Sequence, residues 1–180
     1  MTVPRLDIIY YVACSLDGFI ATADGGVEWL DNFQGQGEDY GYAEFYGSCD
    51  ALIMGSHTYE VSLKFGDWPS KDKPSWVFTN RELAVVDPSI TLTSDEPAAV
   101  VKEMHSKGIK QAWMMGGGKL AGSFLEAVLL TEFRVFVMPV ILGDGIPLLA
   151  GVNHEHNLRL TKAESYDSGV VELRYVKGID

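Results

Sequence analysis

The chain has 180 residues, of which 47% are hydrophobic and 22% are charged. These proportions are typical of globular domains, so we expect one domain over residues 1–180 rather than a disordered or fibrous protein. Lys and Arg number 14 against 25 Asp and Glu, which gives a formal net charge of −11. Because nucleic acid is held mainly by clustered Lys and Arg, no nucleic-acid partner is expected.

No apolar run approaches the ~20 residues of a membrane-spanning helix, and the N-terminus lacks the layout of a signal peptide. We therefore expect a cytoplasmic protein with no membrane partner. The two cysteines, Cys14 and Cys49, lie far apart and form neither a disulfide framework nor a metal-binding spacing. Free cysteine is among the most buried residue types, so we expect two buried thiols and no metal site.

The first part of the chain predicts alternating strands and helices. Asp7 to Cys14 is a continuous apolar run that predicts a strand buried on both faces. The glycine-rich stretch from Ser15 to Asp39 predicts a loop long enough to be a lid. Helical spacing of apolar residues predicts a helix over Tyr40–Cys49, followed by a short strand at Ala51–Met54. Ser56 is a candidate cap for the next helix.

The same alternation continues to residue 130. That next helix is predicted to run from Ser56 to about Lys64, and short strands are predicted at Ser75–Thr79 and Ile90–Thr93. A helix over Pro97–Lys107 begins with proline and is closed by Gly108. The final predicted pair is a strand at Gln111–Met115 and a helix over Leu120–Leu130.

The last part of the chain has a different character. Glu132 to Leu142 predicts a long strand, and the GDGIPLL segment that follows predicts a turn. Leu158–Tyr166 and Gly169–Val176 alternate apolar and polar residues around a turn, which predicts a hairpin. The complete pattern predicts an α/β fold, with helices on both faces of a mostly parallel sheet and an antiparallel hairpin at its C-terminal end.

The strongest local signal is WMMGGGKLAGSFL, residues Trp113 to Leu125. A strand leads into three glycines and a helix start that carries Lys119. The first turn of a helix has unpaired N–H groups, and glycine lets the backbone approach a phosphate closely, so this segment is a candidate pyrophosphate cradle. Its spacing matches neither the dinucleotide fingerprint nor the P-loop. The alternative is an ordinary tight turn between a strand and a helix.

Two further segments carry polar residues just after predicted strands. IMGSHTYE repeats the strand, glycine and helix-start arrangement around Gly55, and FTNRE places Thr79, Asn80 and Arg81 after a strand end. Ligands of open α/β sheets bind at such strand ends. The alternatives are a surface or capping role for His57 and an exposed turn for FTNRE.

These motifs, with SLDGFIA near the N-terminus and VMPVILGDGIPLL later, together resemble the dihydrofolate-reductase-like family. The resemblance is to the branch that contains the reductase domain of the bifunctional riboflavin-biosynthesis deaminase-reductase, and it covers Asp7 to Val176. It implies a three-layer α/β/α fold and a nicotinamide cofactor, NADPH. It also implies a cis peptide bond between Gly116 and Gly117. A homodimer is implied as well, for which the apolar strand Phe133–Leu142 offers a surface.

The resemblance also assigns roles to residues. Ala13 and Ile20 correspond to positions that hold the nicotinamide carboxamide, and the Gly55 turn corresponds to one that receives the pyrophosphate. The FTNRE turn corresponds to the site of the adenosine ribose and its 2′-phosphate, and the triple-glycine turn to a second phosphate site. The complete set of expected cofactor residues is Ala13, Ile20, Gly55, Ser56, His57, Thr58, Thr79, Asn80, Arg81, Met115, Gly116, Gly117, Gly118, Lys119 and Leu120.

Several departures from the family pattern narrow the function. Ser56 stands where relatives often carry arginine, and no arginine matches the one that binds the glutamate tail of folate, which disfavours dihydrofolate reductase itself. The zinc deaminase domain is excluded because its histidine and paired cysteines are absent. Asp39 and Asp17 are the candidate catalytic acids. The alternatives are a helix cap for Asp39 and a turn residue for Asp17.

The sequence therefore predicts an NADPH-dependent reductase of a small heterocyclic compound, pteridine-like or aminopyrimidine-like, or of a carbonyl compound. In this hypothesis the protein orients the hydride donor and acceptor, while a carboxyl group or water supplies the proton. Two alternatives remain open, a nicotinamide-dinucleotide-binding protein without turnover and an oligomeric scaffold. The candidate substrate-pocket aromatics, which could equally be core residues, are Phe19, Trp29, Tyr42 and Phe45.

Overall fold

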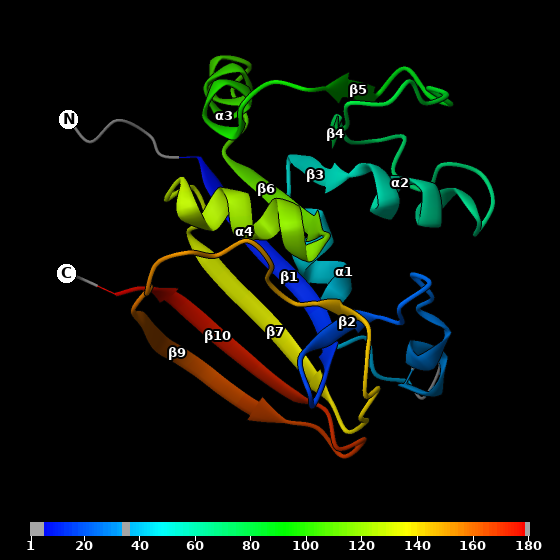
Figure 1. Ribbon diagram of the computed structural model, residues 1–180, viewed down its shortest axis with the longest axis vertical. Helices are drawn as coiled ribbons and strands as arrows, with labels where there is room; N and C mark the ends of the chain where they lie inside the picture. Colours follow the sequence, from blue (N-terminus) through cyan, green and yellow to red (C-terminus); the bar gives the residue numbers. More distant parts are fainter. Residues whose placement is uncertain (1–5, 34–36, 179–180) are drawn as a thin grey trace.

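The computed structural model describes residues 6–33 and 37–178. The strands of its main sheet are β1 (Asp7–Ser15), β3 (Ala51–Gly55), β4 (Ser75–Phe78), β5 (Ile90–Thr93), β6 (Gln111–Gly116), β7 (Glu132–Met138), β9 (Leu158–Ser165) and β10 (Val171–Lys177). They form an eight-stranded sheet in the order β5-β4-β3-β6-β1-β7-β10-β9 (Figure 1). The helices are α1 (Tyr42–Ser48), α2 (Ser56–Leu63), α3 (Pro97–Ser106) and α4 (Gly118–Glu126).

The strands from β5 to β7 are all parallel, and β10 runs antiparallel to both β7 and β9. The β9–β10 pair is the hairpin that the alternating C-terminal segments predict. The predicted α/β fold, mostly parallel with an antiparallel C-terminal hairpin, is therefore confirmed. A short second sheet joins β2 (Phe19–Ala21) to β8 (Ile146–Pro147).

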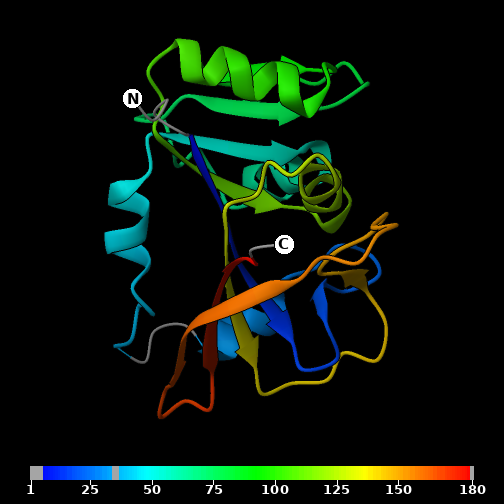
Figure 2. The same cartoon turned by 90° about the vertical axis from the view of Figure 1, so that its left-hand side faces the viewer.

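Helices pack on both faces of the parallel part of the sheet. On one face α3 and α4 cover a large apolar cluster that includes Ile8, Tyr10 and Met114. On the opposite face α1 and α2 cover two smaller clusters, in which Phe45 packs against Ile9 and Tyr59 joins the other cluster. Figure 1 shows α4 in front of β1, and Figure 2 shows α1 on the other side of the sheet. The layers are incomplete at the hairpin, since β9 is exposed along almost all of its length.

Two predicted elements end earlier than the sequence pattern suggested. The helix predicted to reach Leu130 ends at Glu126, because Val128 adopts a left-handed conformation (φ 59°). The N–H of Leu129 then donates to the carbonyl of Phe124, which closes the helix in a Schellman motif. The strand predicted to reach Leu142 ends at Met138, because Pro139 follows and proline has no N–H to donate.

The segments predicted as loops contain short elements. The Ser15–Asp39 stretch includes β2 and a 3₁₀ helix, η1 (Glu28–Phe33), and the GDGIPLL segment supplies β8. Both cysteines are buried free thiols as predicted. In the part of the chain that the structure covers, no helix is long and apolar enough to cross a membrane.

The β7 part of the surface expected for a homodimer is covered by the chain itself, whereas Ile141 after it is exposed. Phe133, Phe136 and Met138 of β7 are buried within the chain itself, because β7 lies between β1 and β10. An apolar strand in the middle of a sheet is covered on both sides by the monomer's own layers. The dimer stays a prediction, and its interface needs another surface.

Candidate functional site

A cavity of about 690 Å³ opens at the carboxyl ends of the parallel strands. Residues from the ends of β1, β3, β4 and β6 and from the starts of α2 and α4 line it. The hydrogen-bonded neighbours β3 and β6 continue into α2 and α4, and these helices pack on opposite faces of the sheet. This divergence is a topological switch point, where open α/β sheets characteristically bind ligands.

The first wall of the cavity is the turn between β3 and α2. Gly55 is the N-cap of α2, and no side chain hydrogen-bonds to the first turn as a cap. Ser56 is therefore the first helical residue and not the predicted cap. Ser56, His57 and Thr58 all line the cavity. The first N–H groups of α2 lack partners inside the helix and carry the positive end of its dipole, so they are suited to receiving an anion.

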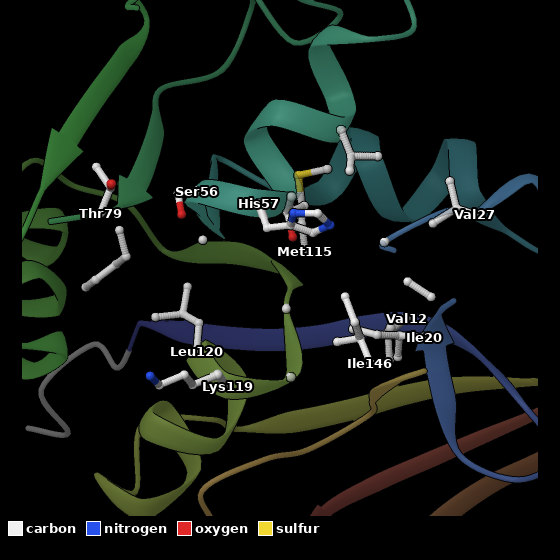
Figure 3. A pocket seen from close by; sticks show the side chains of 18 of the residues that line it. Val12, Ile20, Val27, Ser56, His57, Thr79, Met115, Lys119, Leu120 and Ile146 are labelled. Atoms are coloured by element: carbon white, nitrogen blue, oxygen red, sulfur yellow. The ribbon is translucent and has the colours of Figure 1, made fainter. Parts of the chain in front are cut away.

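The second wall is the turn between β6 and α4, and it repeats this construction. Gly117 is the N-cap of α4, again without a side-chain cap, and the Gly116–Gly117 peptide bond is cis, as the resemblance implies. A Cβ atom added at Gly55 would lie 3.9 Å from the Gly116 carbonyl oxygen. The two uncapped turns thus approach each other closely. Lys119 and Leu120 follow on the same wall (Figure 3).

Glycine is required or favoured for a different structural reason at each of positions 116, 117 and 118 of the second turn. A Cβ at Gly118 would clash with the carbonyl oxygen of Pro147, so this glycine lets α4 pack on the segment after β8. A Cβ at Gly117 would meet nothing within 4 Å, and Gly117 lines the cavity. Gly116 does not line the cavity, but its φ of 117° requires glycine. Only Gly117 therefore leaves room for a ligand.

The third wall is the turn after β4, and it brings only part of its predicted residues to the cavity. Thr79 and Asn80 line it, whereas Arg81 does not. The Arg81 guanidinium forms a bidentate ion pair with Glu60 of α2, at 3.2 and 2.6 Å. The hydrogen bond from Arg81 lowers the pKa of the Glu60 carboxyl. Both side chains are exposed, and Arg81 follows the lining residue Asn80 with its charge already paired.

The opposite end of the cavity is apolar. The predicted nicotinamide residues Ala13 and Ile20 line it, together with Val12, Val27 and Ile146 (Figure 3). His57 lies between this end and the polar end in the same view. A Cβ on Gly25 would clash with the His57 ring, so the turn before Val27 packs directly against the imidazole.

Neither candidate acid lies on the cavity wall. The Asp39 carboxylate accepts hydrogen bonds from the N–H groups of Gly41 and Ala43 at the start of α1, which is the helix-cap alternative. The Asp17 carboxylate accepts from Ser15 and from the N–H groups of Leu142 and Gly143. These bonds, with Ser15 first, lower the pKa of the Asp17 carboxyl. Both carboxylates therefore accept hydrogen bonds from backbone N–H groups away from the cavity.

Aromatic side chains line the cavity, but not the predicted ones. Phe45 is buried at 2% exposure in the core under α1, and Phe19, Trp29 and Tyr42 do not line the cavity. Tyr11 and Trp113 do line it. Tyr11 lies in the middle of β1 and Trp113 in the middle of β6, so nothing in the sequence pattern signals that their side chains reach a site. Met115, which follows Trp113 by two residues, is on the wall as expected.

The comparison with protein families gives one match, over residues 7–172, to the RibD C-terminal domain. Among curated proteins, the uncharacterized protein YwjB of Bacillus subtilis (strain 168) is 36% identical over 170 residues, covering 94% of this chain and 97% of YwjB. The riboflavin biosynthesis protein RibD of Corynebacterium ammoniagenes is 28% identical over an alignment 155 residues long, which covers 77% of this chain and 44% of that protein. The chain therefore spans less than half of that RibD.

Solved structures show the same fold. A protein of Shewanella sp. PV-4 named for riboflavin biosynthesis has a TM-score of 0.87 and 26% identity, with 97% of this chain and 100% of that one covered. A deaminase/5-amino-6-(5-phosphoribosylamino)uracil reductase of Thermotoga maritima has a TM-score of 0.73 and 18% identity, with 97% and 57% covered. The fold, the cavity at the strand ends and the match over residues 7–172 agree, and the chain belongs to the RibD C-terminal domain family.

Proposed function

We propose that the protein is an NADPH-dependent reductase that transfers hydride to a small heterocyclic or carbonyl compound. The observation that carries this proposal is the meeting of two uncapped helix N-termini, at Gly55 and Gly117, on one cavity. A pyrophosphate carries negative charge on two linked phosphates, and two such termini offer it hydrogen-bond donors from both sides. The cavity also continues into an apolar end, which could receive the nicotinamide ring.

The residues present fit this cofactor. The N–H groups at the starts of α2 and α4 would bind the pyrophosphate, and Lys119 would add a positive charge. Thr79 and Asn80 would bind the adenosine ribose, with Arg81 at the 2′-phosphate. Backbone groups of Ala13 and Ile20 would orient the carboxamide. The room that glycine leaves at position 117 is the space in which a phosphate would sit.

Reduced nicotinamide supplies a hydride when it is bound. The apolar side chains around Val12 and Ile146 exclude water from that end of the cavity, which favours direct transfer between two stacked rings. Two proton sources were expected, a carboxyl group and water, and the lining of the cavity favours water. Asp17 and Asp39 are engaged outside the cavity, and no acidic residue is among the described residues that line it. We therefore assign the proton to water that enters with the substrate.

The lack of an acid on the described walls also favours a second candidate, a nicotinamide-dinucleotide-binding protein without turnover. One assay separates the two. NADPH oxidation is followed by nicotinamide absorbance with a panel of pteridines, aminopyrimidines and quinones, and NADPH binding is measured in parallel by fluorescence. A reductase oxidises NADPH with at least one compound. Tight NADPH binding with no oxidation across the panel supports the binding protein, and no binding at all overturns both.

A further inference from the structure

The two ends of the cavity differ in chemistry. Ser56, Thr79 and Lys119 lie at one end, and Val12, Ile20, Val27 and Ile146 lie at the other (Figure 3). The proposed function places the phosphates and adenosine at the polar end. The apolar end is then where the substrate must meet the nicotinamide ring.

An aromatic wall, formed by Tyr11 and Trp113, also lines the cavity. Tyr11 belongs to one apolar cluster with the lining residue Leu30, whose N–H donates to the carbonyl of Val27, which places the wall beside the apolar end. The two rings meet edge to face, with centroids 6.0 Å apart. Trp113 donates its indole N–H to the backbone carbonyl of Tyr11 at 2.9 Å, and the Tyr11 hydroxyl donates to the carbonyl of Tyr40 at 3.3 Å. Behind the wall Phe45 stacks on Tyr11 at 4.3 Å and 10°. The polar atoms of both rings are thus satisfied, and the surface they add to the cavity is aromatic carbon.

Charge is the second distinguishing feature. Among the residues described on the cavity wall, Lys119 is the only one with a Lys, Arg, Asp or Glu side chain, and it lies at the polar end. Behind the wall, Arg134 of β7 lies over the Phe45 ring and is already paired with Glu132 at 2.6 Å. The helix start closest to the wall, that of α1, is already occupied by the Asp39 carboxylate. Among the described residues of the apolar end, a substrate phosphate would therefore find no lysine or arginine as a partner.

Burying a phosphate without a partner is costly, because an ionised group loses its hydration and gains nothing in return. Flat rings, in contrast, gain from contact with aromatic faces. We propose that the substrate is an uncharged planar ring compound without a phosphate group, held between the nicotinamide and the Tyr11–Trp113 wall. This inference rests on the proposed function. It separates this chain from the Thermotoga relative, whose name specifies a phosphoribosylated uracil.

The chemistry of the proposed step balances. The hydride carries two electrons from reduced nicotinamide to a carbon of a C=N or C=O bond in the planar substrate. Water protonates the nitrogen or oxygen of that bond and is left as hydroxide, and the nicotinamide leaves oxidised. No other oxidant or reductant is needed.

The test compares matched ligands. 5-Amino-6-(5-phosphoribosylamino)uracil, its dephosphorylated form and 1,4-naphthoquinone are each offered to the protein with NADPH, and kcat/KM is measured. Binding of each compound in the presence of NADP⁺ is read independently from quenching of tryptophan fluorescence. We expect the dephosphorylated compound to exceed its phosphorylated partner at least tenfold in both readouts, and the quinone to bind. Equal or better binding of the phosphorylated compound overturns the inference.

A pair of charge variants sharpens the result. Val27→Lys places a cation at the apolar end, and Ser123→Lys places the same cation on α4, one turn after Lys119. Val27→Lys should move the ligand preference toward the phosphorylated compound by tenfold or more, whereas Ser123→Lys should leave it unchanged. A shift of equal size in both variants contradicts the assignment of the two ends.

The two proposals fail in distinguishable ways. NADPH binding without binding of either unphosphorylated compound overturns the substrate inference and leaves the cofactor site standing. Absence of NADPH binding overturns the proposed function, on which the inference rests. If Val27→Lys does not fold, the comparison of ligands on the unmodified protein decides alone.

Discussion

The choice between NADPH and NADH should depend on one ion pair, that of Arg81 with Glu60. NADPH differs from NADH by one 2′-phosphate. The guanidinium of Arg81, which follows the cavity residue Asn80, is already paired with Glu60. A charge-assisted hydrogen bond contributes roughly 1.5–3 kcal/mol. Because a phosphate must share or displace Glu60, we expect NADPH to be preferred over NADH by about ten- to a hundredfold, taking about 1.4 kcal/mol per factor of ten.

Variants of this ion pair test the assignment. Arg81→Ala should abolish most of the preference while leaving NADH affinity nearly unchanged, and Glu60→Gln should raise NADPH affinity because it frees the guanidinium. Glu82→Gln removes one carboxylate from the same exposed turn without breaking the Arg81–Glu60 pair, so it serves as the control. Both cofactors are titrated against all four proteins. An unchanged preference in Arg81→Ala would show that this residue does not recognise the phosphate.

The contribution of Glu126 to the free energy of unfolding should depend on pH. Its carboxylate, at the end of α4, meets His156 at 3.1 Å and His154 at 2.6 Å and accepts the Asn153 N–H. These contacts lower its pKa from 4.5 to about 2. A carboxyl whose pKa is lowered by folding stabilises the protein above its unfolded pKa, and that contribution is lost as pH falls from about 4.5 to about 2.

We therefore expect Glu126→Gln to lower the free energy of unfolding near pH 6. The difference from the unmodified protein should shrink progressively as pH falls from about 4.5 to about 2, because the unfolded chain takes up a proton at Glu126 first and the folded protein only near pH 2. Urea unfolding at a series of pH values measures this difference. A difference that stays constant between pH 6 and pH 3 would mean that the charge of Glu126 does not contribute.

Replacing a helix glycine by alanine should have opposite effects on stability in α1 and α4. A Cβ at Gly47 of α1 would meet nothing within 4 Å, while one at Gly122 of α4 would clash with the Ala150 carbonyl oxygen. Gly47→Ala should raise the free energy of unfolding by about 0.5–1 kcal/mol, because alanine favours the helix. Gly122→Ala should lower it by ~1–3 kcal/mol through overpacking. Denaturant unfolding of both variants gives the signs, and a stabilised Gly122→Ala protein would contradict the packing of α4 on this segment.

Elements were predictable from the sequence where local pattern and tertiary context agree. The buried strand at Asp7, the hairpin and the two glycine turns follow from periodicity and from the special conformations of glycine. Local pattern failed where a distant contact decides the outcome. No periodicity reveals that β2 pairs with β8 across the chain, or that Arg81 turns toward Glu60. The aromatic wall was missed because buried strand residues give the same signal whether or not they reach a cavity.

The whole molecule offers a new surface for the expected homodimer. The edge strand β9 exposes Leu158 and Leu160, at 40% and 48%, and its outer backbone edge has no neighbouring strand in the sheet. Edge strands of this kind pair readily with a second copy. Light scattering at micromolar concentration should give twice the chain mass of 19.8 kDa. Leu160→Lys should shift the protein toward the monomer, while Val85→Lys, a charge at an exposed loop valine, should not. A mass of 19.8 kDa for the unmodified protein would exclude the dimer.

The proposed function requires the two uncapped glycine turns to bind a nicotinamide dinucleotide. The most direct measurement is a titration of NADPH, followed by nicotinamide fluorescence, into the unmodified protein, Gly117→Ala and Gly47→Ala. The added methyl group at Gly117 occupies open space on the cavity wall, whereas the one at Gly47 lies on α1 outside the cavity. We predict saturable binding of one NADPH per chain, weakened about tenfold or more by Gly117→Ala, since losing one phosphate hydrogen bond costs about 1.4 kcal/mol or more. Gly47→Ala should bind like the unmodified protein. Absence of saturable binding, or equal affinity in all three proteins, would contradict binding of the dinucleotide at these turns.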